Sequence, residues 1–68
     1  MTVTVNGQLR QFPEDATVSA VVASLTAVPD GRGVAVAIDG EVVPRGAWAD
    51  TPLHDGARLE VLAAVQGG

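Results

Sequence analysis

The sequence contains no cysteine and no lysine, and its only aromatic residues are Phe12 and Trp48. The missing cysteine excludes disulfides, thiolate metal sites and iron–sulfur ligation. The missing lysine leaves no internal side-chain ammonium on which copies of the chain could be joined through isopeptide bonds. The sole histidine, His54, lies in a turn-like stretch beside scattered carboxylates. A closed zinc site needs four ligands, so we expect His54 to be a solvated loop residue and the chain to have no metal site.

Basic residues and long apolar runs are also scarce. Four dispersed arginines face eight acidic residues, which gives a formal net charge of −4. Contact with a phosphate backbone needs a basic stripe, so no nucleic-acid partner is expected. The longest apolar runs, 34–38 and 61–65, are far too short to span a membrane. Residues 1–5 lack the pattern of a signal peptide. These features predict a cytoplasmic protein without a membrane partner.

The first half of the chain predicts a hairpin followed by one helix. Residues 2–5 alternate polar and apolar side chains, as does the stretch 8–12, which is the period of half-buried strands. Asn6-Gly7 between them is a strong signal for a tight hairpin turn, because both residues tolerate positive φ. An apolar stripe with helical spacing then predicts a helix that ends near residue 26. Its members are Val18, Val21, Val22 and Leu25.

The second half predicts three further strands. Residues 34–38 and 41–43 flank Asp39-Gly40, another tight-turn signal, and Pro44 confines the second of these strands to a sheet edge. We expect residues 45–52 to be irregular, with Trp48 as a semi-buried cover residue. Residues 58–65 form the last strand. The order strand-strand-helix-strand-strand-strand predicts an α+β, ubiquitin-like β-grasp: a mixed sheet packed on one main helix, with the last strand beside the first.

The sequence concentrates its chemistry at the end, Gly67-Gly68. Glycine has no Cβ, so it can thread a channel too narrow for any other residue. We expect the Gly68 carboxylate to be a chemical handle; the alternative is a frayed terminus of no significance. No Ser/His/Asp or paired-carboxylate site can be identified, so no catalytic residue is expected. The predicted organisation is a β-grasp domain over residues 1–65 and a flexible tail over residues 66–68.

Over essentially its whole length, the chain resembles the ThiS family, the ubiquitin-like sulfur carriers of thiamine (thiazole) biosynthesis. The resemblance rests on Asn6-Gly7 after the first strand, the stretch VAVAIDGEVVPR at 34–45, Trp48, and the ending AVQGG at 64–68. It implies that the chain is a protein substrate and not an enzyme. Its Gly68 carboxylate would be adenylated and then converted to a thiocarboxylate, with Gly67, Gln66 and Val65 threading into the partner.

The resemblance also implies the partners. An E1-like adenylyltransferase of the ThiF type would use ATP and Mg²⁺, so that the chain itself binds no cofactor. A sulfur donor such as a cysteine desulfurase would provide a persulfide, and thiazole synthase of the ThiG type would consume the sulfur.

Strand alternation suggests where such partners could dock. If Leu59 and Val61 point inward, the opposite face of the last strand carries small and apolar residues beside those of a neighbouring strand. This candidate docking patch could equally be ordinary scattered surface hydrophobicity. It comprises Leu62, Ala64, Ala35, Ala37 and Glu60.

Three alternatives for function remain open at this point. The small subunit of molybdopterin synthase shares the fold, the tail and the thiocarboxylate chemistry. A ubiquitin-like modifier would instead form isopeptide bonds with target lysines. A non-covalent β-grasp interaction module would not need Gly67-Gly68 at all.

Overall fold

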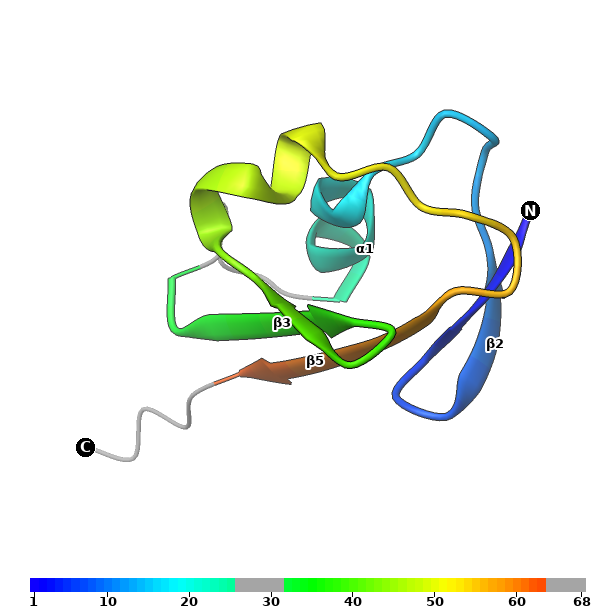
Figure 1. The fold of residues 1–68 in the computed structure, drawn as a ribbon. Helices are drawn as coiled ribbons and strands as arrows, with labels where there is room; N and C mark the ends of the chain where they lie inside the picture. Colours follow the sequence, from blue (N-terminus) through cyan, green and yellow to red (C-terminus); the bar gives the residue numbers. More distant parts are fainter. Residues whose placement is uncertain (26–31, 64–68) are drawn as a thin grey trace.

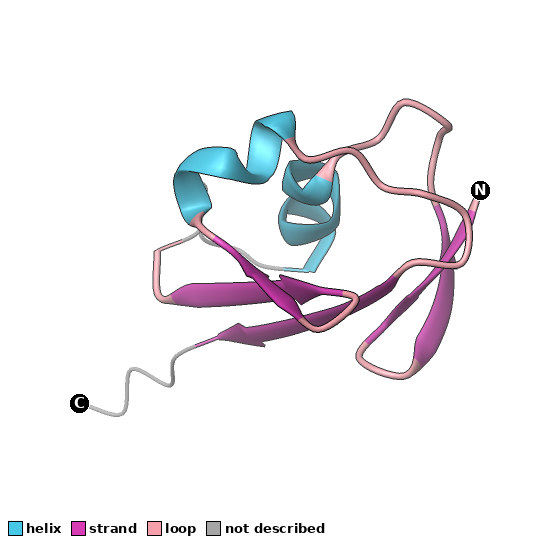
Figure 2. Cartoon of the chain, in the orientation of Figure 1, coloured by secondary structure: helices cyan, strands magenta, loops and turns pink. Residues whose placement is uncertain are grey.

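The computed structural model describes residues 1–25 and 32–63, and the elements follow the expected order (Figures 1 and 2). A single main helix is surrounded in sequence by five strands. In chain order the elements are β1 (Thr2–Val5), β2 (Gln8–Gln11), α1 (Val18–Leu25), β3 (Val34–Ile38), β4 (Glu41–Val43), the 3-10 helix η1 (Arg45–Asp50) and β5 (Arg58–Ala63).

The strands form one mixed sheet in the order β2-β1-β5-β3-β4. The last strand, β5, runs parallel to β1 and antiparallel to β3, and the two hairpins β1–β2 and β3–β4 flank it. The strand that precedes Pro44 lies at the sheet edge, as a residue without a backbone donor requires. The predicted β-grasp with its last strand beside the first is confirmed.

Both tight turns adopt the backbone that their sequences predict. Asn6 and Asp39 each have φ of 50°, and the glycines that follow them have φ of 82° and 87°. Two successive residues with positive φ match the twist of a two-residue hairpin, and Asn-Gly and Asp-Gly tolerate this backbone best. The turns therefore fix the register of the two hairpins on either side of β5.

The hydrophobic core lies between the sheet and α1. Val18, Val21 and Val22 on the predicted stripe are buried, whereas Leu25 at its end is half-buried. Packing of this stripe holds the eight-residue helix, since an isolated helix of that length is not stable in water. Figure 1 shows α1 and η1 on the same side of the sheet. In the part of the chain that the structure describes, no helix is long and apolar enough to cross a membrane.

The segment after β4 differs from the expectation. Residues 45–50 are a 3-10 helix and not irregular, and Trp48 is buried in the core with only 5% of its surface exposed. Its indole Nε1 donates a 2.9 Å hydrogen bond to the Val43 carbonyl, so burial leaves no polar atom unpaired. A 3-10 helix of six residues, about two turns, is too short to show an apolar period, which is why the sequence pattern did not reveal it.

Candidate functional site

β5 is the described element that leads toward the predicted site. It extends to Ala63, whereas Ala64, Val65, Gln66, Gly67 and Gly68 lie outside the described residues. The strand starts beside the β1–β2 hairpin and runs toward the opposite side of the molecule (Figure 1). It pairs with β1 at Arg58 and Leu59 and with β3 from Leu59 to Ala63, so its first part lies inside the sheet and its last described residues pair with β3.

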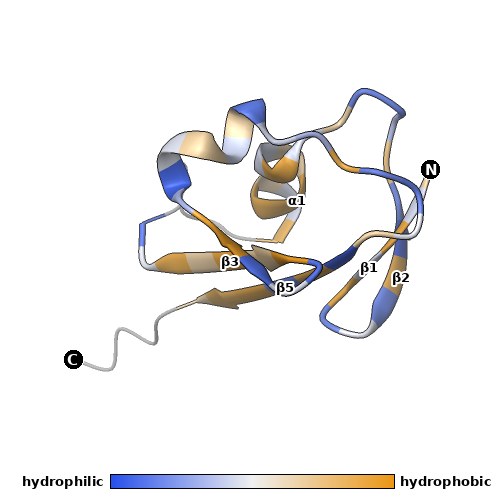
Figure 3. Ribbon diagram, viewed as in Figure 1, coloured by the Kyte–Doolittle hydropathy of each residue, from blue (hydrophilic) through white to orange (hydrophobic). Residues whose placement is uncertain are grey.

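The side chains of β5 alternate between the two faces as predicted. Leu59 and Val61 are buried against the core at 0% and 7% exposure. Glu60 and Leu62 are exposed on the other face, and Leu62 leaves 70% of its surface accessible. Period-2 alternation across a half-buried sheet accounts for both sets. Figure 3 shows that hydrophobic residues dominate β3 and β5 up to the end of the described strand.

The register brings the candidate docking residues together on this outer face. Ala35 pairs with Leu62, and Ala37 pairs with Glu60. Ala35 is exposed and Ala37 is half-buried. The two alanines therefore form a low surface next to the Leu62 side chain. Whether partners use this surface remains a prediction.

One further residue belongs to this surface and was missed by the reasoning from sequence. Val42 on β4 pairs with Ala37 and is 78% exposed. Because paired residues lie on the same face, Val42 extends the surface to the sheet edge. Alternation within the three-residue strand 41–43 could have indicated this. We call the set Ala35, Ala37, Val42 and Leu62, which share this outer face, the outer patch.

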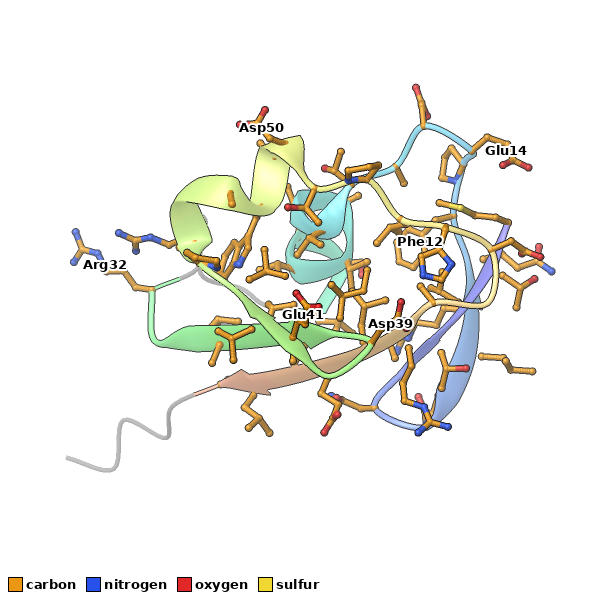
Figure 4. All side chains as sticks on the ribbon, viewed as in Figure 1. Phe12, Glu14, Arg32, Asp39, Glu41 and Asp50 are labelled. Carbon is orange, nitrogen blue, oxygen red and sulfur yellow. The ribbon has the colours of Figure 1, made fainter. Side chains whose placement is uncertain are left out.

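The rest of the outer face is more polar. Glu60 and Arg58 on β5 lie between the outer patch and Thr4 on β1, which pairs with Arg58. A shallow open depression on this side is lined by Thr4, Asn6, Gly7, Arg58, Leu59 and Glu60. Charged residues elsewhere are dispersed: in Figure 4, Glu14, Arg32 and Asp50 project from well-separated segments. The outer patch is thus an apolar area with a polar border on the β1 side.

His54 is exposed, as expected for a loop residue, but it has a partner. Its Nε2 lies 2.6 Å from Asp39 Oδ2 in the turn between β3 and β4, where Figure 4 labels Asp39. The hydrogen bond from His54, and then the one from the Arg58 backbone N–H, lower the pKa of Asp39. The hydrogen bond to Asp39 is also the main cause of the raised pKa of His54. Within residues 1–25 and 32–63, no group of three metal-ligating side chains occurs.

Known proteins that resemble this chain agree on one family. The ThiS family model matches residues 3–68. A protein of *Paramagnetospirillum magneticum* named thiazole synthase is 37% identical over all 68 residues, which span only 20% of that protein's length. The crystal structure of the thiamine biosynthesis protein ThiS from *Geobacter metallireducens* is 33% identical and covers both chains fully, with a TM-score of 0.77. An NMR structure of a thiamine biosynthesis protein from the same organism is 31% identical over this whole chain and 88% of its own, with a TM-score of 0.79.

These matches cover the β-grasp domain and also the ending Gly67-Gly68. The chain belongs to the ThiS family of ubiquitin-like sulfur carriers.

Proposed function

We propose that this chain carries sulfur for thiazole formation in thiamine biosynthesis, as a thiocarboxylate at Gly68. The observation that supports this most strongly is the extent of the family match, which runs through residue 68 and so includes the diglycine. The chain acts as a co-substrate of other enzymes and supplies no catalytic residue of its own. It binds no cofactor; ATP and Mg²⁺ act in the activating partner.

The chemistry begins with activation of a poor acyl donor. The Gly68 carboxylate attacks the α-phosphate of ATP in a ThiF-type adenylyltransferase, which forms an acyl-adenylate and releases pyrophosphate. The terminal sulfur of a persulfide then attacks the acyl carbon and AMP leaves, so that one difficult step becomes two easier ones. The acyl disulfide formed is cleaved by a thiol, which is oxidised to a disulfide and leaves the thiocarboxylate on Gly68.

Within this proposal, the folded domain is the recognition handle. The outer patch offers an apolar docking surface, and β5 itself runs away from the β1–β2 hairpin as far as Ala63 (Figure 1). The slim Gly67-Gly68 end can enter a narrow channel. The charges that offset the phosphates of ATP come from the partner, since this sequence has no glycine-rich phosphate loop.

The relative from *Paramagnetospirillum magneticum* supports thiazole synthase as the sulfur acceptor. In that protein, named thiazole synthase, a segment matching this entire chain occupies a fifth of the length. A carrier-like segment and the rest of the protein are therefore present in one polypeptide. We propose that the present chain binds a separate thiazole synthase of the ThiG type and delivers sulfur to it.

Intact-mass spectrometry tests the proposal directly. The full chain is incubated with the ThiF-type enzyme of its source organism, Mg²⁺-ATP, and a cysteine desulfurase with cysteine. The expected product is heavier by one oxygen-to-sulfur exchange, localised to Gly68 by fragmentation. Adding thiazole synthase and its small-molecule substrates should return the mass to its starting value.

A chain lacking Gly68 and a reaction lacking ATP serve as controls, and neither should gain sulfur. An unchanged mass in the complete reaction would contradict the carrier role. High-mass conjugates that disappear when Gly68 is deleted would instead support a protein modifier. A thiocarboxylate that thiazole synthase leaves intact would point to a different sulfur acceptor, such as a pterin precursor.

A further inference from the structure

The two hairpin turns that flank β5 share an unusual feature. Asn6 and Asp39 occupy the same position in their turns, with the same φ of 50° before a glycine. In both cases the side chain bonds to the backbone of β5. Asp39 Oδ1 accepts from the Arg58 N–H at 3.0 Å, at the start of the strand. Asn6 bonds to Val61, further along the strand.

The Asn6 contact has the form of a backbone ladder. Its Nδ2 donates to the Val61 carbonyl at 3.0 Å, and its Oδ1 accepts from the Val61 N–H at 2.8 Å. A side-chain amide carries one carbonyl acceptor and an NH₂ donor, so it can reproduce the pairing of a peptide unit. Asp at this position would keep the acceptor and lose the donor.

This contact extends the β1–β5 pairing beyond the point where β1 ends. Backbone pairing aligns Thr4 with Arg58 and Val5 with Leu59, and the Asn6 N–H donates to the Leu59 carbonyl at 3.0 Å. At Gly7 the backbone turns away into the hairpin. The Asn6 side chain takes the place of the next residue of β1 and satisfies both backbone groups of Val61.

The position of the contact matters for the tail. With Asn6 in place, β5 is hydrogen-bonded on its β1 side as far as Val61, so seven residues, 62–68, remain beyond the last of these bonds. Without the Asn6 side chain, the last hydrogen bond on the β1 side is at Leu59, so nine residues, 60–68, lie beyond it. For residues 60–63, the pairing with β3 would then be the remaining strand contact. Backbone that is not held in advance must lose conformational freedom when it enters a partner's channel.

We propose that Asn6 is a positioning residue for the sulfur-carrier reaction: its side-chain amide clamps β5 at Val61 and thereby shortens the length of chain before Gly68 that is not held from the β1 side. The proposal rests on the proposed function of Gly68. Asn6 touches no reacting atom. Its effect is on how readily the tail reaches the adenylating site, and not on the chemical step there.

The test compares Asn6→Gly with Asp39→Gly. Glycine accepts φ of 50° at both positions, so each variant removes one side-chain contact to β5 while keeping the turn. Asp39→Gly is the matched control, because its contact lies at Arg58, the end of β5 remote from the tail. Adenylation is followed by ATP–pyrophosphate exchange with the ThiF-type enzyme, and amide hydrogen exchange is followed by NMR.

The expected result for Asn6→Gly is a rise of about five- to tenfold in the KM for the carrier with kcat unchanged, the size of effect that one or two net hydrogen bonds have on an ordering equilibrium. Val61 amide exchange should accelerate in parallel. Asp39→Gly should leave KM within about twofold of the unsubstituted chain, whatever its effect on global stability. Asn6→Asp should fall between the unsubstituted chain and Asn6→Gly, and it replaces Asn6→Gly if that variant does not fold.

Three results would overturn the inference: an unchanged KM for Asn6→Gly, an equal rise in KM for Asp39→Gly, or Val61 amide exchange that is not accelerated. Failure of the underlying function looks different. If the unsubstituted chain itself is not adenylated, the proposed role of Gly68 fails. Amide exchange at Val61 and ¹⁵N relaxation at Leu62 and Ala63 still decide, without any partner, whether Asn6 clamps the strand.

Discussion

The two faces of β5 have opposite environments although their residues alternate along one short strand. Leu59 and Val61 are buried in the hydrophobic core, whereas Glu60 and Leu62 face away from it. Leu59 and Leu62 carry the same side chain on opposite faces, and only their environments differ. Burial of a leucine contributes about 1.5–3 kcal/mol, and an exposed leucine contributes none of this.

Because of this difference, we expect the inner face of β5 to determine stability and the outer face to determine partner binding. A change on the inner face should act on the folded state, and through it on everything else. A change on the outer face should leave the fold intact and act on partners alone. The sheet can therefore carry a docking surface directly behind its core without compromising either.

The largest expected effect is on the inner face. Leu59→Ala removes a side chain with 0% exposure from the middle of the core and should lower the free energy of unfolding by about 2–5 kcal/mol. In a domain of 68 residues this is a large share of the total stability. Urea denaturation followed by circular dichroism measures the change.

Leu62→Ala is the control for this comparison. It removes the same atoms from the exposed face and should change the free energy of unfolding by no more than about 0.5 kcal/mol. Equal losses for the two variants would mean that the faces are not energetically distinct.

The next effect concerns the outer patch. Leu62→Asp places a charge at the β5 end of the outer patch and should reduce kcat/KM for partner-dependent adenylation about tenfold or more, as truncation of an interface hot spot does. Folding should be preserved because Leu62 is 70% exposed. ATP–pyrophosphate exchange with the ThiF-type enzyme provides the rate.

Leu9→Asp is the matched control, since Leu9 is 77% exposed on β2, at the opposite edge of the sheet from the outer patch. It should leave the rate unchanged. Undiminished adenylation of a folded Leu62→Asp variant would remove the outer patch from the docking surface. A similar loss for Leu9→Asp would mean that added negative charge alone, and not the patch, explains the effect.

Much of this arrangement could be predicted from sequence because local rules govern it. Asn6-Gly7 and Asp39-Gly40 encode their turns, and alternation assigned Leu59 and Leu62 to opposite faces. Trp48 was misjudged because its burial depends on a 3-10 turn and on a bond to Val43, neither of which has a periodic signature.

Contacts between segments that are distant in sequence could not be predicted either, because no local pattern encodes them. The Asn6 side chain is separated from Val61 by 55 positions, and His54 from Asp39 by 15. Both pairs come together only through the strand order of the folded sheet. Asn6 was recognised as a turn residue, but nothing in its local sequence indicates that its amide also binds the last strand.

The smallest expected effect concerns the exposed pair His54 and Asp39, which lies near the start of β5. It tests whether an exposed contact, like an exposed side chain on the outer face, adds little to stability. His54 has a raised pKa, so its pairing with Asp39 stabilises the fold fully below the ordinary histidine value of 6.5 and is lost as pH rises through the higher folded value. Asp39 has a lowered pKa, so its contribution is present above 3.8 and is lost as pH falls through the lower folded value. We expect the contribution to be greatest between these limits and small throughout, because both side chains are at least half exposed.

NMR titration of the His54 ring measures the effect, with Asp39→Asn as the variant that removes the carboxylate. The pKa of His54 should lie above 6.5 in the unsubstituted chain and fall toward 6.5 in Asp39→Asn. His54→Gln should abolish the corresponding pH dependence of stability while leaving adenylation unchanged, since His54 is not part of the outer patch. A marked loss of stability in His54→Gln at pH 5 would contradict the separation of buried from exposed contacts. It would show that the polar contacts at the start of β5 contribute to stability on the scale of the core beneath them.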